Sequence, residues 1–205
     1  MSDQRFWDNL YNERDQVWSG RPNTWLTTIV GELPPGRALD LGCGEGGDAI
    51  WLAERGWAVT AVDITDVALG RLRKAAAEHG VAERIRAERH DLETSFPDGE
   101  FDLVSAQFFQ SPVEFPRAEI LRKAAHTLVP GGLLLVVDHG AAPPWSKHAH
   151  EHTRFSTPDE VYAALDLDAA AWRSEIREAR ERATTDPDGR PATLLDNVLA
   201  VRRLG

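Results

Sequence analysis

Residues 38–65 read ALDLGCGEGGDAIWLAERGWAVTAVDIT, and three glycines interrupt this segment at alternate positions, Gly42, Gly44 and Gly46. A short apolar run precedes the glycines, an amphipathic stretch follows them, and a second apolar run ends at Asp63. This order predicts a strand, a tight turn, a helix and a second strand, which together form one βαβ unit. Because glycine has no Cβ, the turn can bring backbone close to a bound ligand.

Two classes of cofactor compete for such a unit. Gly42, Gly44 and Gly47 satisfy the G-x-G-x-x-G pattern of dinucleotide sites, with Asp63 about 20 residues further on. An acid at the end of the second strand is the residue type that binds a ribose diol. The glycines and this acid therefore predict an adenosine-containing ligand without deciding which one.

The charge of the glycine turn separates the two classes. Four acidic residues lie in or beside the turn and the helix after it: Asp40, Glu45, Asp48 and Glu54. No lysine or arginine occurs between residues 37 and 55. A pyrophosphate beside Asp40 and Glu45 would meet like charges at ~4 Å, at a cost of about 1 to 4 kcal/mol per pair. A ligand with an ammonium and a sulfonium group would be attracted instead, and its carboxylate can use backbone N–H groups near the helix start. We therefore expect S-adenosylmethionine.

The string DLGCGEG at 40–46 resembles the first motif of the class I S-adenosylmethionine-dependent methyltransferases, and Asp63 matches the ribose-binding acid of that family. The similarity is closest to small bacterial single-domain members of the tellurite-resistance and thiopurine type, and it covers residues 37–137 well. It implies an α/β fold with a Rossmann-like, seven-stranded, mostly parallel sheet, helices on both faces and a C-terminal antiparallel hairpin.

The pattern of the remaining chain agrees with that fold, because strands and helices alternate along it. Further strands are expected at 84–89, 101–106, 133–137, 172–182 and 194–203. Further helices are expected at 6–11, 25–30, 66–79, 116–128 and 158–165. Thr24 is a plausible N-cap of the second of these, and Thr65 or Asp66 of the third. Turn-rich residues 185–191 between the last two strands predict a hairpin. We expect a single methyltransferase domain at 1–205, with an N-terminal helical lid at 1–36 and an α/β core at 37–205.

Composition limits the partners and the compartment. The chain has 23 basic and 33 acidic residues and a net charge of −10, which disfavours nucleic acid or an anionic membrane as partner. No apolar run approaches the ~20 residues of a membrane span, and the start MSDQRFWDN does not resemble a signal peptide. Cys43 is the only cysteine, so the chain forms no internal disulfide. A cytoplasmic protein that acts on a small molecule is expected, with its oligomeric state left open.

The cofactor contacts follow from the resemblance and from the predicted strand ends. Asp40 and the glycine turn would hold the methionyl part, Asp63 the ribose, and Asp91 with Leu92 the adenine, although Asp91 could instead only form a turn. The candidate cofactor residues are Asp40, Gly42, Cys43, Gly44, Gly46, Asp63, Ile64, Asp91, Leu92 and Gln107. Cys43 is interpreted as a small packing residue of the turn rather than a nucleophile.

The acceptor pocket is expected at the same edge of the sheet, because ligands bind at the carboxyl ends of parallel strands. Its candidate residues are Trp18, Arg21, Phe108, Phe109, Trp145 and His139. Trp18 and Arg21 would form a lid, although the aromatic residues of the opening segment could instead fasten a helix to the core. His139 follows the most apolar strand and could take a proton from the acceptor at neutral pH, or only border the pocket.

His148, His150 and His152 alternate along one stretch, which raises the possibility of a metal site. In an extended chain these side chains would lie about 7 Å apart on one face, too far to share an ion at ~2 Å unless the backbone curls. A solvated loop is the preferred interpretation, so no metal is expected.

The sequence therefore predicts methyl transfer from S-adenosylmethionine to a small-molecule acceptor by in-line displacement, a reaction that requires mainly alignment and exclusion of water. A non-catalytic S-adenosylmethionine sensor and a nicotinamide-dependent oxidoreductase are the alternatives. A sensor would bind the cofactor but release no S-adenosylhomocysteine with any acceptor. An oxidoreductase would bind a nicotinamide cofactor and would not be protected by S-adenosylmethionine.

Overall fold

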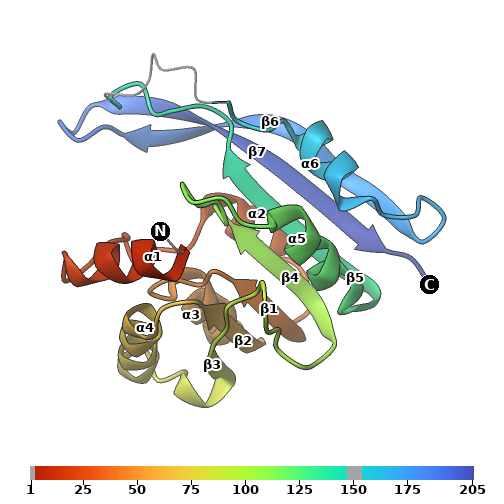
Figure 1. Cartoon of the computed structure of the whole chain (residues 1–205), viewed down its shortest axis with the longest axis horizontal. Helices are drawn as coiled ribbons and strands as arrows, with labels where there is room; N and C mark the ends of the chain where they lie inside the picture. Colours follow the sequence, from red (N-terminus) through yellow and green to blue (C-terminus); the bar gives the residue numbers. More distant parts are fainter. Residues whose placement is uncertain (1–2, 147–153) are drawn as a thin grey trace.

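The computed structural model describes residues 3–146 and 154–205, and within them a seven-stranded sheet runs through the molecule (Figure 1). Its strand order is β3-β2-β1-β4-β5-β7-β6. The strands are β1 (Arg37–Leu41), β2 (Ala58–Asp63), β3 (Ile85–Arg89), β4 (Phe101–Gln107), β5 (Leu128–His139), β6 (Trp172–Thr185) and β7 (Pro191–Arg203). The helices are α1 (Asp3–Asn12), α2 (Thr24–Val30), α3 (Gly47–Glu54), α4 (Asp66–Glu78), α5 (Arg117–His126) and α6 (Pro158–Leu165), with a 3₁₀ turn η1 (Ala82–Arg84).

The first five strands are parallel, and β7 joins β5 antiparallel and pairs with β6 as a long hairpin. The predicted fold is thereby confirmed, and β3 lies at one edge of the sheet. The chain builds outward from β1 to β3 and then returns to place β4 on the other side of β1. This reversal opens a crevice at the carboxyl ends of β1 and β4, where α/β proteins bind ligands.

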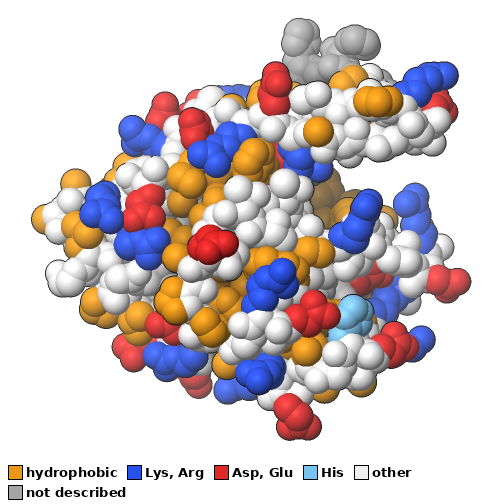
Figure 2. Space-filling view, turned by 180° about the vertical axis from the view of Figure 1, so that it is seen from behind, with side chains coloured by type: hydrophobic (Ala, Val, Ile, Leu, Met, Phe, Trp, Pro, Cys, Tyr) orange, Lys and Arg blue, Asp and Glu red, His pale blue; other side chains and the backbone are white. Residues whose placement is uncertain are grey.

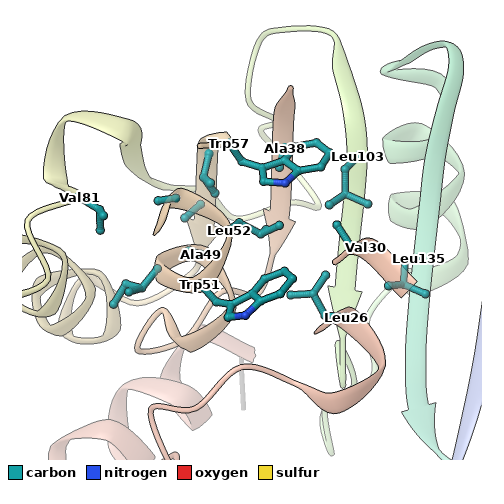
Figure 3. Close-up of a cluster of buried hydrophobic side chains, with 14 of the residues drawn as sticks. Leu26, Val30, Ala38, Ala49, Trp51, Leu52, Trp57, Val81, Leu103 and Leu135 are labelled. Atoms are coloured by element: carbon teal, nitrogen blue, oxygen red, sulfur yellow. The ribbon is translucent and has the colours of Figure 1, made fainter. Parts of the chain in front are cut away.

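Two apolar layers hold the helices against the two faces of the sheet. On one face α2 and α3 pack on β1, β4 and β5, as Figure 3 shows for Leu26, Leu52 and Leu103. On the other face α5 and α6 bury Leu121 and Leu165 against the remaining strand residues. Leu26, Leu52, Leu103, Leu121 and Leu165 are all inaccessible to solvent. Truncating such a leucine to alanine costs about 2 to 5 kcal/mol, so these layers hold the strand ends of the site rigidly.

Local deviations from the predicted elements have physical causes. Thr24 is the first residue of α2 and does not cap it; Asn23 precedes the helix, and its side chain donates to Asp48 instead of capping. β5 begins at Leu128 rather than at residue 133, because its first residue pairs with Phe101 before an irregularity in the register. Thr65 caps α4 as predicted, by accepting a hydrogen bond from the Val67 amide.

No helix in the described part of the chain is both long enough and apolar enough to cross a lipid bilayer.

Candidate active site

A cavity of about 470 Å³ lies at the carboxyl ends of the central strands, within the ~300 to 1,000 Å³ typical of small-molecule sites. On this side of the molecule Figure 2 shows a hollow between the arm formed by β6 and β7 and the body that carries α1. Most of the residues predicted for the site line this one cavity: Trp18, Arg21, Gly42, Cys43, Gly44, Gly46, Asp63, Ile64, Asp91, Leu92, Gln107, Phe108, Phe109 and His139.

The glycine turn requires glycine at two positions for different reasons. Gly44 has φ +53°, and a Cβ there would lie 3.0 Å from the Tyr11 hydroxyl and 3.2 Å from the Trp18 ring. Gly46 has φ +88°, and its Cβ would come within 2.0 Å of Leu72 Cδ1 on α4. These left-handed conformations are costly for residues with a Cβ. The first glycine therefore permits the close approach of the N-terminal segment, and the second permits that of α4.

Asp63 ties the second strand to the glycine turn. Its Oδ2 accepts a hydrogen bond from the Gly44 amide at 2.9 Å, and its Oδ1 accepts one from the Thr65 amide at 3.1 Å. The residue is the last of β2, is 8% exposed and lines the cavity. A carboxylate fixed in this way is preorganised to accept further hydrogen bonds from a ligand in the cavity.

Asp40 lies behind the turn instead of lining the cavity, so its predicted direct contact with the cofactor is not supported. It is 2% exposed, and within the described residues its Oδ2 has no hydrogen-bond partner. Burial raises the pKa of this carboxyl well above its usual range, and the charges of Asp48 and Asp63 raise it further. Three acids crowded behind and beside the turn fit a cationic ligand, which would offset their mutual repulsion.

Glu45 binds the N-terminal segment and an arginine, although its charge suggested that it would act on the cofactor. Its carboxylate accepts hydrogen bonds from the backbone amides of Val17 (3.1 Å) and Trp18 (2.9 Å) and pairs with Arg71 of α4 at 2.7 Å. Nη2 of Arg71 donates to two backbone carbonyls of the N-terminal segment, those of Tyr11 and Arg14. The argument that Glu45 would repel a pyrophosphate is therefore wrong, because α4 supplies a cation that could not be placed from sequence spacing.

Asp48 and the Trp18 ring complete the attachment of the N-terminal segment. Asp48 accepts from both the amide and the side chain of Asn23, each at 2.6 Å. Trp18 Nε1 donates to the Tyr11 hydroxyl at 2.8 Å, and burial together with the charge of Asp63 raises the pKa of this phenol. Tyr11 is buried, whereas Trp18 is 48% exposed and borders the cavity. Tyr11 is thus a buried contact of the opening segment, Trp18 borders the cavity, and the lid role stays a prediction.

Asp91 and Leu92, which were predicted to bind adenine, line the cavity, as does Gln107, a further candidate cofactor residue. Asp91 Oδ1 accepts from the Glu93 amide at 3.1 Å, so the turn-forming role is present, and the residue also lines the cavity. Gln107 is 8% exposed and donates from Nε2 to Ser105. Its Oε1 is buried and has no partner among residues 3–146 and 154–205. Contact of these residues with adenine stays a prediction.

Aromatic rings line the cavity immediately after β4, and one of them reaches the glycine turn, where a Cβ on Gly42 would lie 2.8 Å from Phe109 Cδ2. Phe108 has φ +53°, an uncommon conformation for a bulky residue, and its amide donates to the Val137 carbonyl at 2.7 Å. This backbone turn directs the Phe108 ring onto His139, with ring centroids 4.4 Å apart and planes inclined by 25°. Phe109 meets Phe115 edge to face at 5.3 Å. Strained backbone of this kind is typical of functional sites.

His139 ends β5 beside this aromatic wall. Desolvation lowers the pKa of its imidazole; the nearby Asp196 raises it in opposition, and Arg182 lowers it again. The net direction is downward, so the ring is neutral at neutral pH and one of its nitrogens can accept a proton. Its role as a base stays a prediction.

Sequence reasoning missed the group that supports this end of the cavity. Asp196 of β7 is completely buried and accepts hydrogen bonds from Arg182 Nε and Nη2 and, at 2.9 Å, from Trp25 Nε1. Arg182 lines the cavity. An acid inside the apolar run LLDNVLAV was a signal of a buried polar contact, but its partners lie on β6 and α2, and only the tertiary fold brings them together.

Two further predictions concern the loop after β5. Trp145 is 39% exposed and does not line the cavity, so its predicted place in the acceptor pocket is wrong. The Gly140 amide donates to the Leu195 carbonyl at 2.8 Å, which directs the chain along the β6–β7 hairpin (Figure 1). His148, His150 and His152 lie outside the described residues. Within the residues that are described, no group of three or more potential ligands is placed to hold a metal ion.

Comparisons with known proteins agree with this geometry. A family model described as a methyltransferase domain matches residues 38–132. The chain is 32% identical over 155 residues to the ubiquinone biosynthesis O-methyltransferase of Aeromonas salmonicida, a match that covers 67% of this chain and 63% of that protein. It is 30% identical over 190 residues to the 27-O-demethylrifamycin SV methyltransferase of Amycolatopsis mediterranei, covering 87% of this chain and 68% of that protein.

Other relatives include ribosomal RNA small subunit methyltransferases C, of which the chain spans 36% and 42%. The chain therefore spans from about a third to two thirds of the length of these relatives. The fold is also similar to a solved structure reported as "Conversion of a Disulfide Bond into a Thioacetal Group during Echinomycin Biosynthesis". The TM-score is 0.74 at 22% identity, and the alignment covers 98% of this chain and 93% of that one.

Proposed function

The chain belongs to the class I S-adenosylmethionine-dependent methyltransferases, and we propose that it transfers a methyl group from S-adenosylmethionine to a small organic acceptor by in-line displacement. The observation that carries the proposal is the arrangement of Asp63, the Gly44 amide and the buried acids around one end of the cavity. A hydrogen-bonded carboxylate suits a ribose diol, and a local excess of acids suits a cationic ligand.

When bound, S-adenosylmethionine supplies a methyl group on a sulfonium that a nucleophile can displace. In our proposal Asp63 holds the ribose hydroxyls, and Asp91 and Leu92 border the adenine. The glycine turn, which lines the cavity, would lie beside the methionyl part. Asp40 lies behind the turn and does not line the cavity.

The N-terminal segment would align the reactants and exclude water from them. Backbone amides of this segment donate hydrogen bonds to Glu45 in the glycine turn and to Asp48 at the start of α3, and these bonds fasten the segment. Trp18 and Arg21 then border the cavity from outside, and Phe108 and Phe109 border it from the sheet. Alignment and exclusion of water are the main requirements of such a displacement.

His139 is the proposed base of the reaction. Its lowered pKa keeps the imidazole neutral at neutral pH, and its ring lies against Phe108 at the acceptor end. It would accept a proton from an attacking hydroxyl, amine or thiol on one ring nitrogen.

A small acceptor is proposed over RNA because the chain carries a net charge of −10, whereas RNA binding requires a basic surface. The cytoplasm is the proposed location, since Cys43 is the only cysteine, as suits a reducing compartment.

Methyl transfer to a panel of thiols, amines, phenols, carboxylates and metalloids tests the proposal, with isotope-labelled S-adenosylmethionine as donor. The expected result is labelled product and stoichiometric S-adenosylhomocysteine with at least one acceptor class. Saturable cofactor binding without S-adenosylhomocysteine release from any acceptor would indicate a sensor instead.

A further inference from the structure

Arg182 lies where β6 passes the acceptor end of the cavity, and its guanidinium is held by two of its nitrogens. Nε and Nη2 both donate to the completely buried Asp196, which also accepts from Trp25. Asp196 lies opposite His139 across the β5–β7 pairing. The guanidinium therefore has a fixed position beside the proposed base.

The third nitrogen of this guanidinium, Nη1, is not engaged by the described part of the protein. Among residues 3–146 and 154–205, Nη1 of Arg182 makes no hydrogen bond or ion pair, and the side chain is 20% exposed. The residue lines the cavity and its guanidinium lies 6.0 Å from the centre of the Phe108 ring. Its charge also contributes to lowering the pKa of His139, so its field reaches the cavity wall.

A buried acid that holds an arginine contributes little to stability on balance, because desolvation of both charges opposes their attraction. The arrangement is better explained by positioning. Asp196 is completely buried, whereas Arg182 lines the cavity, so the residue of the pair that a ligand can reach is the positive one. Arg is also the residue best suited to recognise carboxylates.

We propose that Arg182 binds a carboxylate on the methyl acceptor through Nη1, an inference that rests on the proposed function. The acceptor is then an organic acid with an apolar or aromatic body, which packs on Phe108 and Phe109. The two ends of the cavity would in this way bind opposite charges, with the cationic cofactor at the acidic turn and the anionic acceptor at Arg182.

The test uses two probes of equal size, 2-naphthoate and 2-naphthamide, added to the full-length protein saturated with S-adenosylhomocysteine. Ligand-detected NMR titration gives the dissociation constant of each probe. We expect the wild-type protein to bind naphthoate about tenfold more tightly than naphthamide, as one charge-assisted hydrogen bond provides. The double variant Arg182→Gln/Asp196→Asn replaces both charges with amides of similar size, so no buried charge is left unpaired. It should lose the preference for naphthoate and keep its affinity for naphthamide.

Arg180→Gln is the matched control. Arg180 lies two residues away on β6, stacks over Trp25 at 5.3 Å and pairs with Glu178, and it does not line the cavity. It should keep the preference for naphthoate. An equal loss in Arg180→Gln, an unchanged preference in the double variant or no preference in the wild type would overturn the role of Arg182. The affinity of each protein for S-adenosylhomocysteine is measured in the same series. If S-adenosylhomocysteine binds normally, the proposed function stands even where the role of Arg182 fails. If the wild-type protein does not bind S-adenosylhomocysteine, both proposals are overturned.

Discussion

The two ends of the cavity differ in charge and in the elements that form them. The end at the glycine turn is acidic and is built from one continuous segment, β1 to the start of α4, in which Asp63 and Gly44 are hydrogen-bonded to each other. The other end combines aromatic rings with Arg182 and His139, taken from β4, β5 and β6. One end is thus suited to a cofactor shared by a whole family, and the other can vary with the acceptor.

This difference also separates the kinds of change that substitutions should cause. At the glycine turn, side chains and backbone share hydrogen bonds, so substitution should alter cofactor affinity. At the aromatic end, side chains protrude from strand ends that other contacts hold in place. Substitution there should alter turnover or acceptor choice at constant cofactor affinity.

The largest expected effect lies at the aromatic end, in His139→Gln. Removing a general base lowers turnover by about 100-fold or more, while cofactor affinity should stay the same. Because desolvation lowers the pKa of His139 below its ordinary 6.5, wild-type kcat/KM should rise with pH and pass through half of its plateau value below pH 6.5. Rate profiles from pH 5 to 8 check this. A variant with normal turnover would assign His139 to the cavity border only.

The next effect concerns the acidic end. Asp63→Asn keeps the size of the side chain and removes its charge, so affinity for S-adenosylhomocysteine should fall about 10- to 100-fold, as loss of about 1.5 to 3 kcal/mol implies. Asp102→Asn is the matched control, because Asp102 also accepts a backbone hydrogen bond, from Arg37 at 2.7 Å, and does not line the cavity. Calorimetric affinities that fall equally in both variants would place the effect in the sheet rather than in the site.

A smaller effect is expected from the N-terminal segment at the cavity mouth. Trp18→Ala and Arg21→Ala should each lower kcat/KM by about tenfold with little change in melting temperature, because both residues are exposed at the cavity mouth. Trp51→Ala provides the contrast: this tryptophan is 8% exposed within the core, and its removal should cost about 3 to 5 kcal/mol of stability. Paired melting and rate measurements distinguish the two cases. A destabilised Trp18→Ala with normal specific activity would show that Trp18 is only a packing residue.

The smallest effect concerns Asp40. Its folded-state pKa is raised above the ordinary 3.8, so its contribution to stability is complete at low pH and is lost as pH rises through the folded pKa. Asp40→Asn should therefore raise the melting temperature at pH 7, by roughly 2 to 4 °C for each kcal/mol recovered, and the difference should shrink toward pH 4. Melting curves across this range measure it. A difference that grows as the pH falls would contradict the assignment.

The two ends also differ in how far the sequence could reveal them. The β-α-β order, the three glycines and Asp63 are local, so their spacing predicted one βαβ unit and an adenosine-containing ligand, and the family resemblance implied the seven-stranded sheet. The Glu45–Arg71 pair joins the turn to α4, and Asp196 gathers Arg182 and Trp25 from separate elements. Such contacts depend on tertiary packing, which residue spacing does not encode. Trp145 was misplaced for the same reason, since the Gly140–Leu195 hydrogen bond directs its loop elsewhere.

The central claim is that the acidic turn selects a cationic adenosyl cofactor over a dinucleotide. Thermal unfolding of the wild-type protein with S-adenosylhomocysteine or NAD tests it most directly. At 100 times its dissociation constant a ligand adds about 2.7 kcal/mol, which for a chain of this size raises the melting temperature by about 5 to 11 °C. We predict that shift with S-adenosylhomocysteine and none with NAD at equal concentration. A shift with NAD alone would contradict the account.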